Sequence, residues 1–490
     1  MLLPLLLGLG LAEPPPRPNL VLLVADDLGL MDVSTYGGSH PTPNLDALAA
    51  RGVTMEAAYV VSPICAPSRA GILTGRYPQR YGAELITHTV YPRDPFSRAF
   101  ARLFVAGDGW EVAPRQRPPS RAEVDVQGVP TSEITLAELL RGAGYRTAMA
   151  GKWHVGLSEA QRPAARGFER SYGFLEAYSL YEDPDAPDVV NHPLDHFADR
   201  HQWRTGREGP SAILRDGVVI DERRYLTDAI ADELIEDIER YKGEPFFLYG
   251  AFSAPHAPFQ APVSEVHGEP HGRAVYEGMV SRLDQAIGRV VAALDAAGLA
   301  EDTLIVVTSD NGAASYTHVA SNLPYSGGKF THLEGGVRVP MLVIWPGELP
   351  AGGRYSPPVS ALDLFTTFAA AAGAALPADR AYDGVDLRPW LRGERRGAPH
   401  EALYWAAGGS KAIRVGDYKL LVDDLTGDRA LYDVVKDPYE QVDLAPAEPE
   451  RVQVMLEKLE AWRAGNPPAA WPPVMQYRTE QGGHSWVFPL

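Results

Sequence analysis

The sequence predicts an α/β fold with a large, mixed, mostly parallel sheet flanked by helices and a small C-terminal antiparallel sheet plus helix. Three observations carry this prediction. Short apolar runs alternate with longer helical patterns as far as about Pro389. These runs are continuously apolar, which is typical of strands covered on both faces. Beyond Pro389, short strand patterns follow one another between turns, which indicates a separate antiparallel sheet.

Five runs are the expected strands of the large sheet. They cover 19–26 (NLVLLVAD), 145–151 (YRTAMAG), 245–252 (PFFLYGAF), 303–310 (TLIVVTSD) and 339–345 (VPMLVIW). Helical patterns occupy 42–52, 135–144, 226–243, 274–298 and 361–373. In the longest of these, apolar residues recur close to every 3.6 positions, and Gly298 supplies a C-cap.

The C-terminal part is expected to form the smaller unit. Strand patterns at 401–408, 411–424 and 429–438 precede a helical pattern at 449–465, and we expect an irregular tail after it. A chain of 490 residues exceeds the size at which one core usually keeps growing, so we place a large domain at 17–388 and a subdomain with a tail at 389–490. One earlier stretch, 91–127, has six arginines among prolines and aromatic residues and predicts a long surface loop.

The N-terminus and the overall charge limit where the protein acts. Residues 1–12 (MLLPLLLGLGLA) resemble a signal peptide that lacks a basic start, which favours a periplasmic or secreted protein. No apolar run is long enough for a transmembrane segment. The net charge of −18 argues against nucleic acid as a partner, because phosphate binding needs a basic surface. Any anionic substrate must therefore meet locally concentrated positive charge.

Polar side chains follow four of the five predicted strands. The sets are Asp26 with Asp27, Lys152 with His154, His256, and Asp310 with Asn311. Each set alone is more typical of a turn, a cap or a structural histidine than of a functional site. Because ligands of open α/β sheets bind outside the carboxyl ends of the strands, we expect these side chains to converge on one rim.

The residue types indicate the chemistry of that rim. Asp26, Asp27, Asp310 and Asn311 offer hard oxygen ligands, which suit Ca²⁺ or Mg²⁺ better than zinc. Three cations lie in the neighbouring motifs: Arg69, Lys152 and Lys329. Oxygen ligands surrounded by cations and histidines predict a site for a tetrahedral oxyanion, either phosphate or sulfate.

Cys65 is the only cysteine in the chain. Pro67 suits the first turn of a helix, which places Cys65 at a helix N-terminus, where a thiolate is favoured. A thiolate is nevertheless a poor ligand for a cation held by oxygen atoms. The residues alone leave this conflict open.

The stretch CAPSR followed by GILTGR resembles the modification signature of the type I sulfatases, in which a cysteine is oxidised to formylglycine. Further blocks resemble this family in the same order along nearly the whole chain: NLVLLVADDLG, TPNLDALAARG, GYRTAMAGKWHVG, APHAPFQAP, SDNG, EGGVRVPMLVIWPG and LYDVVKDPYEQVDLA. The resemblance implies the alkaline phosphatase-like fold of the sulfatases. It also implies that 17–388 is the catalytic domain.

The resemblance implies a mechanism and the residues that carry it. Cys65 becomes formylglycine, whose hydrate attacks sulfur with one hydroxyl and expels sulfate after the second loses its proton. The implied ligands of Ca²⁺, with Mg²⁺ as the weaker alternative, are Asp26, Asp27, Asp310, Asn311 and the modified residue 65. Arg69, Lys152 and His154 hold the modified residue. Lys152, His256 and Lys329 face the sulfate, with His256 as general acid and Asp310 as a candidate proton acceptor.

The resemblance also implies partners and leaves alternatives open. The expected partners are a sulfated small molecule or glycan and a formylglycine-generating or equivalent maturation enzyme. Glu334 and Arg338 are interpreted as structural. The stretch 91–127 either lines the pocket and favours polyanions or covers apolar surface in solvent. The alternative functions are a phosphodiesterase or phosphonate monoester hydrolase, and a non-catalytic binder of sulfated glycans.

Overall fold

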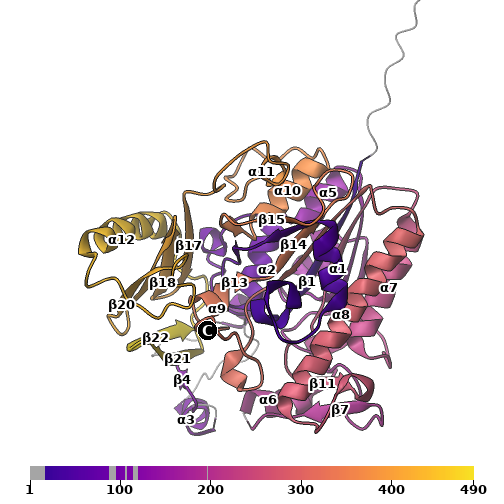
Figure 1. Ribbon diagram of the computed structural model, residues 1–490. Helices are drawn as coiled ribbons and strands as arrows, with labels where there is room; N and C mark the ends of the chain where they lie inside the picture. Colours follow the sequence, from indigo (N-terminus) through magenta and orange to yellow (C-terminus); the bar gives the residue numbers. More distant parts are fainter. Residues whose placement is uncertain (1–16, 88–94, 105–106, 114–119, 196) are drawn as a thin grey trace, which may run out of the picture.

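The computed structural model of the chain describes residues 17–490 except 88–94, 105–106, 114–119 and 196. The predicted signal peptide, 1–12, lies outside the described residues. Figure 1 shows a large sheet with helices on both sides and a smaller sheet beside it that carries the C-terminal helix. None of the helices in the described ranges is long and apolar enough to cross a membrane.

The large sheet has ten strands and confirms the predicted mixed, mostly parallel architecture. Its order is β15 (Gly353–Tyr355), β2 (Val53–Met55), β14 (Met341–Ile344), β12 (Thr303–Ser309), β1 (Asn19–Ala25), β10 (Phe246–Ala251), β5 (Arg146–Lys152), β6 (Arg170–Phe174), β8 (Leu214–Arg215) and β9 (Val218–Val219). The strands from β12 to β6 are parallel to one another, whereas β14 is antiparallel to β12. The carboxyl ends of β1, β5, β10 and β12 therefore meet at one edge.

Alternate residues of β1 face two separate apolar cores, as expected for a strand covered on both sides. Leu20, Leu22 and Val24 belong to one core and Val21, Leu23 and Ala25 to the other. The first core is covered by α2 (Cys65–Thr74), α5 (Leu136–Gly142) and α10 (Asp363–Ala371). The second is covered by α1 (Pro43–Arg51), α7 (Leu226–Tyr241) and α8 (Gly272–Ala296), which lie together on the other side of the sheet (Figure 1).

The strand predicted at 339–345 is interrupted. Residues before Pro340 form β13 (Arg338–Val339), which pairs with β3 (Ala58–Tyr59) in a small sheet completed by β16 (Val359–Ser360). Only β14 joins the large sheet. Proline has no N–H to give to a ladder of hydrogen bonds, so the chain changes sheets at Pro340.

The C-terminal sheet follows the predicted order. It consists of β17 (Ala402–Ala407), β18 (Ser410–Val415), β19 (Tyr418–Asp423) and β20 (Arg429–Asp433), all antiparallel. The helix α12 (Pro449–Ala464) packs Met455 and Leu459 against it. The first strand of this unit begins at Ala402, beyond the predicted boundary at 389, which falls within α11 (Arg388–Leu391). The division into two domains stays a prediction.

Two expectations about irregular segments were wrong. The tail is a hairpin of β21 (Met475–Gln481) and β22 (His484–Pro489), joined by Gly482 and Gly483 at positive φ. A Gly-Gly turn between alternating strands is a hairpin signal that we did not weigh. The stretch 91–127 is also not one loop, because it contains α3 (Pro95–Phe104), β4 (Trp110–Val112) and α4 (Arg121–Asp125), and β4 pairs with β21.

Several short elements complete the helices and strands named above. They are β7 (Val189–His192) paired with β11 (Phe259–Pro262), α6 (Phe197–Thr205), α9 (Glu334–Val337) and α11 (Arg388–Leu391). Of these, α6 and the loops next to α9 and β11 border the site described below.

Candidate active site

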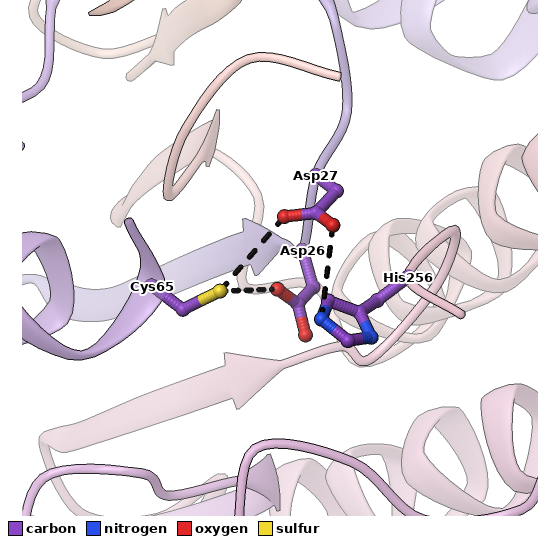
Figure 2. A group of neighbouring side chains, drawn as sticks. All are labelled: Asp26, Asp27, Cys65 and His256. Atoms are coloured by element: carbon purple, nitrogen blue, oxygen red, sulfur yellow. Dashed lines mark hydrogen bonds and ion pairs between the residues drawn. The ribbon is translucent and has the colours of Figure 1, made fainter. Parts of the chain in front are cut away.

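The rim residues predicted from the strand ends lie together at the carboxyl edge of the large sheet. Asp26 and Asp27 follow β1, Lys152 ends β5, His256 lies after β10, and Asp310 follows β12. Figure 2 shows the Cys65 thiol, at the start of α2, facing the carboxylates of Asp26 and Asp27, with His256 beside Asp27. The parallel sheet therefore brings together side chains that are far apart in the sequence.

Asp27 is the most heavily contacted carboxylate of the group. Lys329 Nζ lies 2.8 and 2.9 Å from its two oxygens, and Asn311 Nδ2 donates to Oδ1 at 2.7 Å. Burial would raise the pKa of Asp27, but Lys329 and His256 lower it to about 2. Its φ of 63° places a non-glycine residue in the left-handed region, a strain that tends to occur at functional sites.

Asp26 and Asp310 are paired with the other two cations. Lys152 Nζ lies 2.6 Å from Asp26 Oδ2, and Arg69 Nε lies 2.8 Å from Asp310 Oδ2. Arg69 also donates to the Lys152 carbonyl at 3.1 Å. All four side chains are fully buried, so each charge needs its partner, because an unpaired charge in the interior is costly.

Cys65 is a buried thiol within reach of both carboxylates and one cation. Its Sγ lies 3.3 Å from Asp26 Oδ1, 3.8 Å from Asp27 Oδ1 and 3.3 Å from Lys329 Nζ. Burial raises the pKa of Cys65 well above its ordinary value, and Asp26 adds to the rise. Desolvation and a neighbouring negative charge thus oppose the thiolate that the helix N-terminus alone would favour.

The two predicted histidines differ in their hydrogen bonds. His154 is buried with both ring nitrogens lacking a partner, and burial lowers its pKa well below the ordinary value. His256 Nδ1 donates to the carbonyl of Ala257, while Nε2 lies 3.7 Å from Asp27 Oδ2. Burial, followed by Lys329, lowers the pKa of His256 to about 3. A neutral His256 thus presents an unprotonated Nε2 to the cluster.

The donor atoms of the cluster fit a hard cation. Asp26, Asp27, Cys65 and His256 each offer a ligand atom within 4.8 Å of the others. Asn311 Oδ1 is buried and has no hydrogen-bond partner, so an amide oxygen is left to bind something else. Carboxylate and amide oxygens suit Ca²⁺ or Mg²⁺. Asp310 uses Oδ1 to accept from the Asp27 N–H and Oδ2 to accept from Arg69, and each oxygen keeps a second lone pair.

A cavity of about 710 Å³ opens onto the cluster. Cys65, His154, His256 and Lys329 line its inner end. Its outer walls come from α6, from the loop around Tyr316 and from the hairpin formed by β21 and β22 with β4. Among the described lining residues, the stretch 91–127 contributes Asp108 and Trp110 and no arginine. Arg93, Arg115 and Arg117 lie outside the described residues.

Sequence reasoning missed several supporting residues. Tyr276 donates to Asp32 Oδ2 at 2.5 Å and lies 3.4 Å from the Asp27 carbonyl, so this pair holds the backbone that carries the two aspartates. Tyr249, on β10, lies 3.5 Å from Arg69 Nη1. Asp32 closes the aspartate-rich block after β1, which is a signal that could have pointed to it. Tyr276 and Tyr249 have no local signal, because each belongs to an ordinary apolar pattern.

The comparisons with known proteins agree on one family. A family model described as Sulfatase matches residues 18–374. The chain is 34% identical to the steryl-sulfatase of Mus musculus over 458 residues, which covers 80% of this chain and 68% of that protein. It is also 34% identical to the N-acetylgalactosamine-6-sulfatase of Sus scrofa over 420 residues, covering 84% and 73% of the two chains.

Solved structures give the same result for the fold. The crystal structure of Ps i-CgsB has a TM-score of 0.76 and 32% identity, covering 93% of this chain and 94% of that one. The phosphonate monoester hydrolase of Agrobacterium radiobacter has a TM-score of 0.61 at 20% identity, covering 91% and 96% of the two chains, a likeness that concerns the fold alone.

Proposed function

The chain belongs to the sulfatase family and is a sulfuric ester hydrolase, and we propose that it releases sulfate by means of a formylglycine made from Cys65 beside a bound Ca²⁺. The observation that carries the proposal is the position of Cys65. Its thiol lies within 3.3 Å of both Asp26 Oδ1 and Lys329 Nζ. A buried thiol of raised pKa is inert as a nucleophile, whereas an oxygen nucleophile at this position meets cations and oxygen ligands.

The formylglycine at position 65 and the bound Ca²⁺ would supply complementary chemistry. The hydrated aldehyde at position 65 would supply an attacking hydroxyl and a second hydroxyl whose loss of a proton expels sulfate. Ca²⁺ would supply positive charge for the oxygens of the transferring sulfuryl group. Asp26, Asp27, Asp310 and Asn311 would hold the ion, with Mg²⁺ as the less suitable alternative because it demands a stricter geometry.

The chain's own residues orient the ester and stabilise charge. Lys329, already against Asp27 and Cys65, would bind a sulfate oxygen, and Lys152 would bind another while neutralising Asp26. Arg69 fixes Asp310, which is the candidate acceptor for the nucleophile's proton. The unpartnered nitrogens of His154 leave it able to hydrogen-bond the modified residue.

His256 is the candidate general acid for the leaving oxygen. In its neutral form Nδ1 carries the proton that the Ala257 carbonyl accepts, so His256 has to gain a proton at Nε2 before it can donate one. A sulfate monoester brings a negative charge next to Nε2, and a nearby negative charge favours the protonated imidazole. The anionic substrate would thus favour the protonated form of His256, which is the form that can donate a proton to the leaving oxygen.

We further propose that residues 17–388 form the catalytic domain and 389–490 a supporting subdomain. Export to the periplasm or the exterior remains a proposal from residues 1–12, and maturation requires an enzyme that converts Cys65. The substrate class is an aryl or carbohydrate sulfate. The sulfatase names of the relatives favour sulfate over phosphodiester or phosphonate esters, and the filled set of site residues favours catalysis over mere glycan binding.

Peptide mass measurement across residue 65 of active protein tests the proposal. Conversion of Cys65 to formylglycine lowers the peptide mass by about 18 Da. Side-by-side rates on 4-nitrophenyl sulfate and bis(4-nitrophenyl) phosphate should favour the sulfate by about 100-fold or more in kcat/KM. An unmodified thiol in active protein contradicts the nucleophile, and faster turnover of the phosphate diester contradicts the substrate class.

A further inference from the structure

The helix α6 carries two buried oxygen atoms without a hydrogen-bond partner, and both belong to residues that line the cavity. Asp199 Oδ2 accepts from the Leu194 N–H at 2.6 Å and from Trp203 Nε1 at 2.8 Å, which fixes the carboxylate. Its other oxygen, Oδ1, is buried without a partner, and so is Oε1 of Gln202. Both residues line the cavity.

These two acceptors form a pair on one face of the helix. Residues three apart lie on the same side of an α-helix, so Asp199 and Gln202 present their oxygens to the same space. An unsatisfied buried acceptor costs free energy unless something in the cavity donates to it. The group that fits two adjacent acceptors is one with several O–H or N–H donors.

An aromatic wall borders the same cavity. Trp110, Tyr316 and Phe330 pack edge-on or tilted against one another, with ring centroids 5.1 to 5.4 Å apart, and all three line the cavity. Lys329 Nζ lies 5.5 Å from the Phe330 ring centroid, so this wall begins at the reactive centre. Ligand sites commonly combine such apolar walls with a few polar groups that set orientation.

Tyr316 connects the reactive centre with α6 electrostatically. Burial raises the pKa of Tyr316, Lys329 opposes that rise, and Asp27 and Asp199 add to it. The phenol therefore lies within electrostatic range of both the cluster around Cys65 and the carboxylate on α6.

Among the described residues of the outer cavity, acidic side chains outnumber lysines and arginines. Asp108, Glu176, Asp195 and Asp199 line it, and among the described lining residues Lys329 is the only lysine or arginine. Asp195 is neutralised by an ion pair with Arg200, whereas Asp199 and Glu176 have no such partner in the described part of the chain. A second anionic group on the substrate would face these carboxylates and be repelled.

We propose that Asp199 and Gln202 bind the alcohol part of the ester by accepting hydrogen bonds from its hydroxyl groups, and that the acidic cavity selects a neutral sugar carrying a single sulfate. The ring packs against the aromatic wall while its sulfate reaches Lys329. The inference rests on the proposed sulfate-ester hydrolysis and adds to it a specificity site.

Selectivity ratios test the acceptor pair. Enzyme with modified Cys65 is assayed on 4-nitrophenyl sulfate, which has no hydroxyl donor, and on methyl hexopyranosides that carry one sulfate. For the best sugar, Gln202→Met and Asp199→Asn should each lower the ratio of kcat/KM for sugar over aryl ester about tenfold or more. Gln453→Met on the outer face of α12 is the matched control and should leave both rates unchanged, since Gln453 contacts Glu457 far from the cavity.

A second comparison tests the acidic cavity. The same sugar with a second sulfate should show kcat/KM about tenfold or more below that of the monosulfate. Added salt should reduce this difference in kcat/KM, because it screens the repulsion between the second sulfate and the carboxylates. Unchanged ratios in both variants would mean that water alone satisfies the two acceptors and would overturn the inference while leaving sulfatase activity intact. A preference for the disulfate would overturn the selection of a single sulfate.

A binding measurement separates this inference from the proposed function. If the modified protein hydrolyses no sulfate ester, the proposed function fails. Calorimetry with a methyl hexopyranoside sulfonate, whose C–S bond cannot be hydrolysed, then decides whether Asp199 and Gln202 bind the sugar. Affinity that falls about tenfold or more in Gln202→Met and not in Gln453→Met supports the sugar site, and equal affinity or no binding overturns it.

Discussion

The protein contains two buried clusters of charged side chains that look alike in composition and differ in their hydrogen bonds. The first is the reactive cluster around Cys65, with Asp26, Asp27 and Asp310 facing Arg69, Lys152 and Lys329. The second, which we call the brace, joins α9 to the C-terminal sheet: Glu334 and Glu440 face Lys419 on β19, with Arg338 and Arg414 beside them. Both clusters consist of buried acids and bases.

In the brace, every fully buried side-chain nitrogen and oxygen of these five residues has a hydrogen-bond partner. Lys419 Nζ lies 3.0 Å from Glu334 and 3.1 Å from Glu440, and Tyr59 donates to Glu334 at 2.6 Å. In the reactive cluster, by contrast, Arg69 Nη2, Asn311 Oδ1 and both ring nitrogens of His154 are buried without a hydrogen-bond partner. Unsatisfied hydrogen-bonding capacity, rather than burial or charge, therefore distinguishes a site that binds from one that stabilises.

Replacing the nucleophile should have the largest effect. Cys65→Ala should lower sulfate release from 4-nitrophenyl sulfate by about 10⁴-fold or more, because no other group can take over the covalent step. The melting temperature should change by only a few degrees, about the shift expected for one small buried side chain. Sulfate release and thermal unfolding measure the two effects, and activity that survives the substitution would refute Cys65 as the nucleophile.

Removing the cation should affect the reactive cluster and spare the brace. Chelation with EDTA should lower kcat by about 100-fold or more and lower the melting temperature, with Ca²⁺ restoring both better than Mg²⁺. In Asp27→Asn the melting temperature should no longer respond to Ca²⁺. The exposed Asp302→Asn is the control and should respond like the wild type. A chelated protein with full activity would remove the metal from the mechanism.

How far the sequence predicted each cluster follows from where its residues lie. Asp26, Lys152, His256 and Asp310 follow directly after apolar strands, and a parallel sheet must bring such strand ends together. The motif that contains Glu334 and Arg338 predicts a structural role for them. Lys419, which completes the brace, belongs to an ordinary strand pattern and has no such motif. No hydrophobic period in the sequence specifies which strand of the C-terminal sheet packs against which loop of the preceding part of the chain.

The parts that could not be predicted are contacts between distant irregular segments. The hairpin partner of β4 lies far along the chain, as the bond between Gln476 and Glu111 across 365 residues illustrates. Asp199 and Gln202 face the cavity only because α6 packs beside the rim, which no local pattern encodes. The raised pKa of the Cys65 thiol is also not encoded locally, since its desolvation depends on the whole surrounding fold.

Breaking the brace should reduce stability rather than activity. Lys419→Met leaves Glu334 and Glu440 buried together without their shared cation, and we expect the free energy of unfolding to fall by about 3–5 kcal/mol. The matched control is Lys458→Met, which removes a solvent-exposed pair with Glu401 and should leave the free energy of unfolding almost unchanged. Urea unfolding measures both.

The counterpart in the reactive cluster is Lys152→Met. It should lower kcat/KM of folded enzyme by about 100-fold, whereas folded Lys419→Met should keep the wild-type kcat/KM. A loss of kcat/KM in folded Lys419→Met comparable to that in Lys152→Met would contradict the division of roles between the clusters.

The smallest expected effect concerns a titratable pair that resembles the brace and lies outside both clusters. His400 Nε2 lies 2.8 Å from Asp363 Oδ1, at the start of α10. Burial alone would lower the pKa of His400, but the hydrogen bond with Asp363 raises it above the ordinary value of 6.5. A raised folded-state pKa means that the stabilisation is fully present below the unfolded-state pKa and is lost as the pH rises through the folded-state pKa.

The difference in free energy of unfolding between wild type and His400→Gln should therefore be largest near about pH 5.5, on the order of 1 kcal/mol, and should shrink as the pH rises above about 7. Urea unfolding at several pH values measures it, with His267→Gln, an exposed histidine, as the control. A difference that grows with pH would mean that neutral rather than charged His400 stabilises the fold. Stabilisation by a charged buried pair, as in the brace, would then not extend to His400 and Asp363.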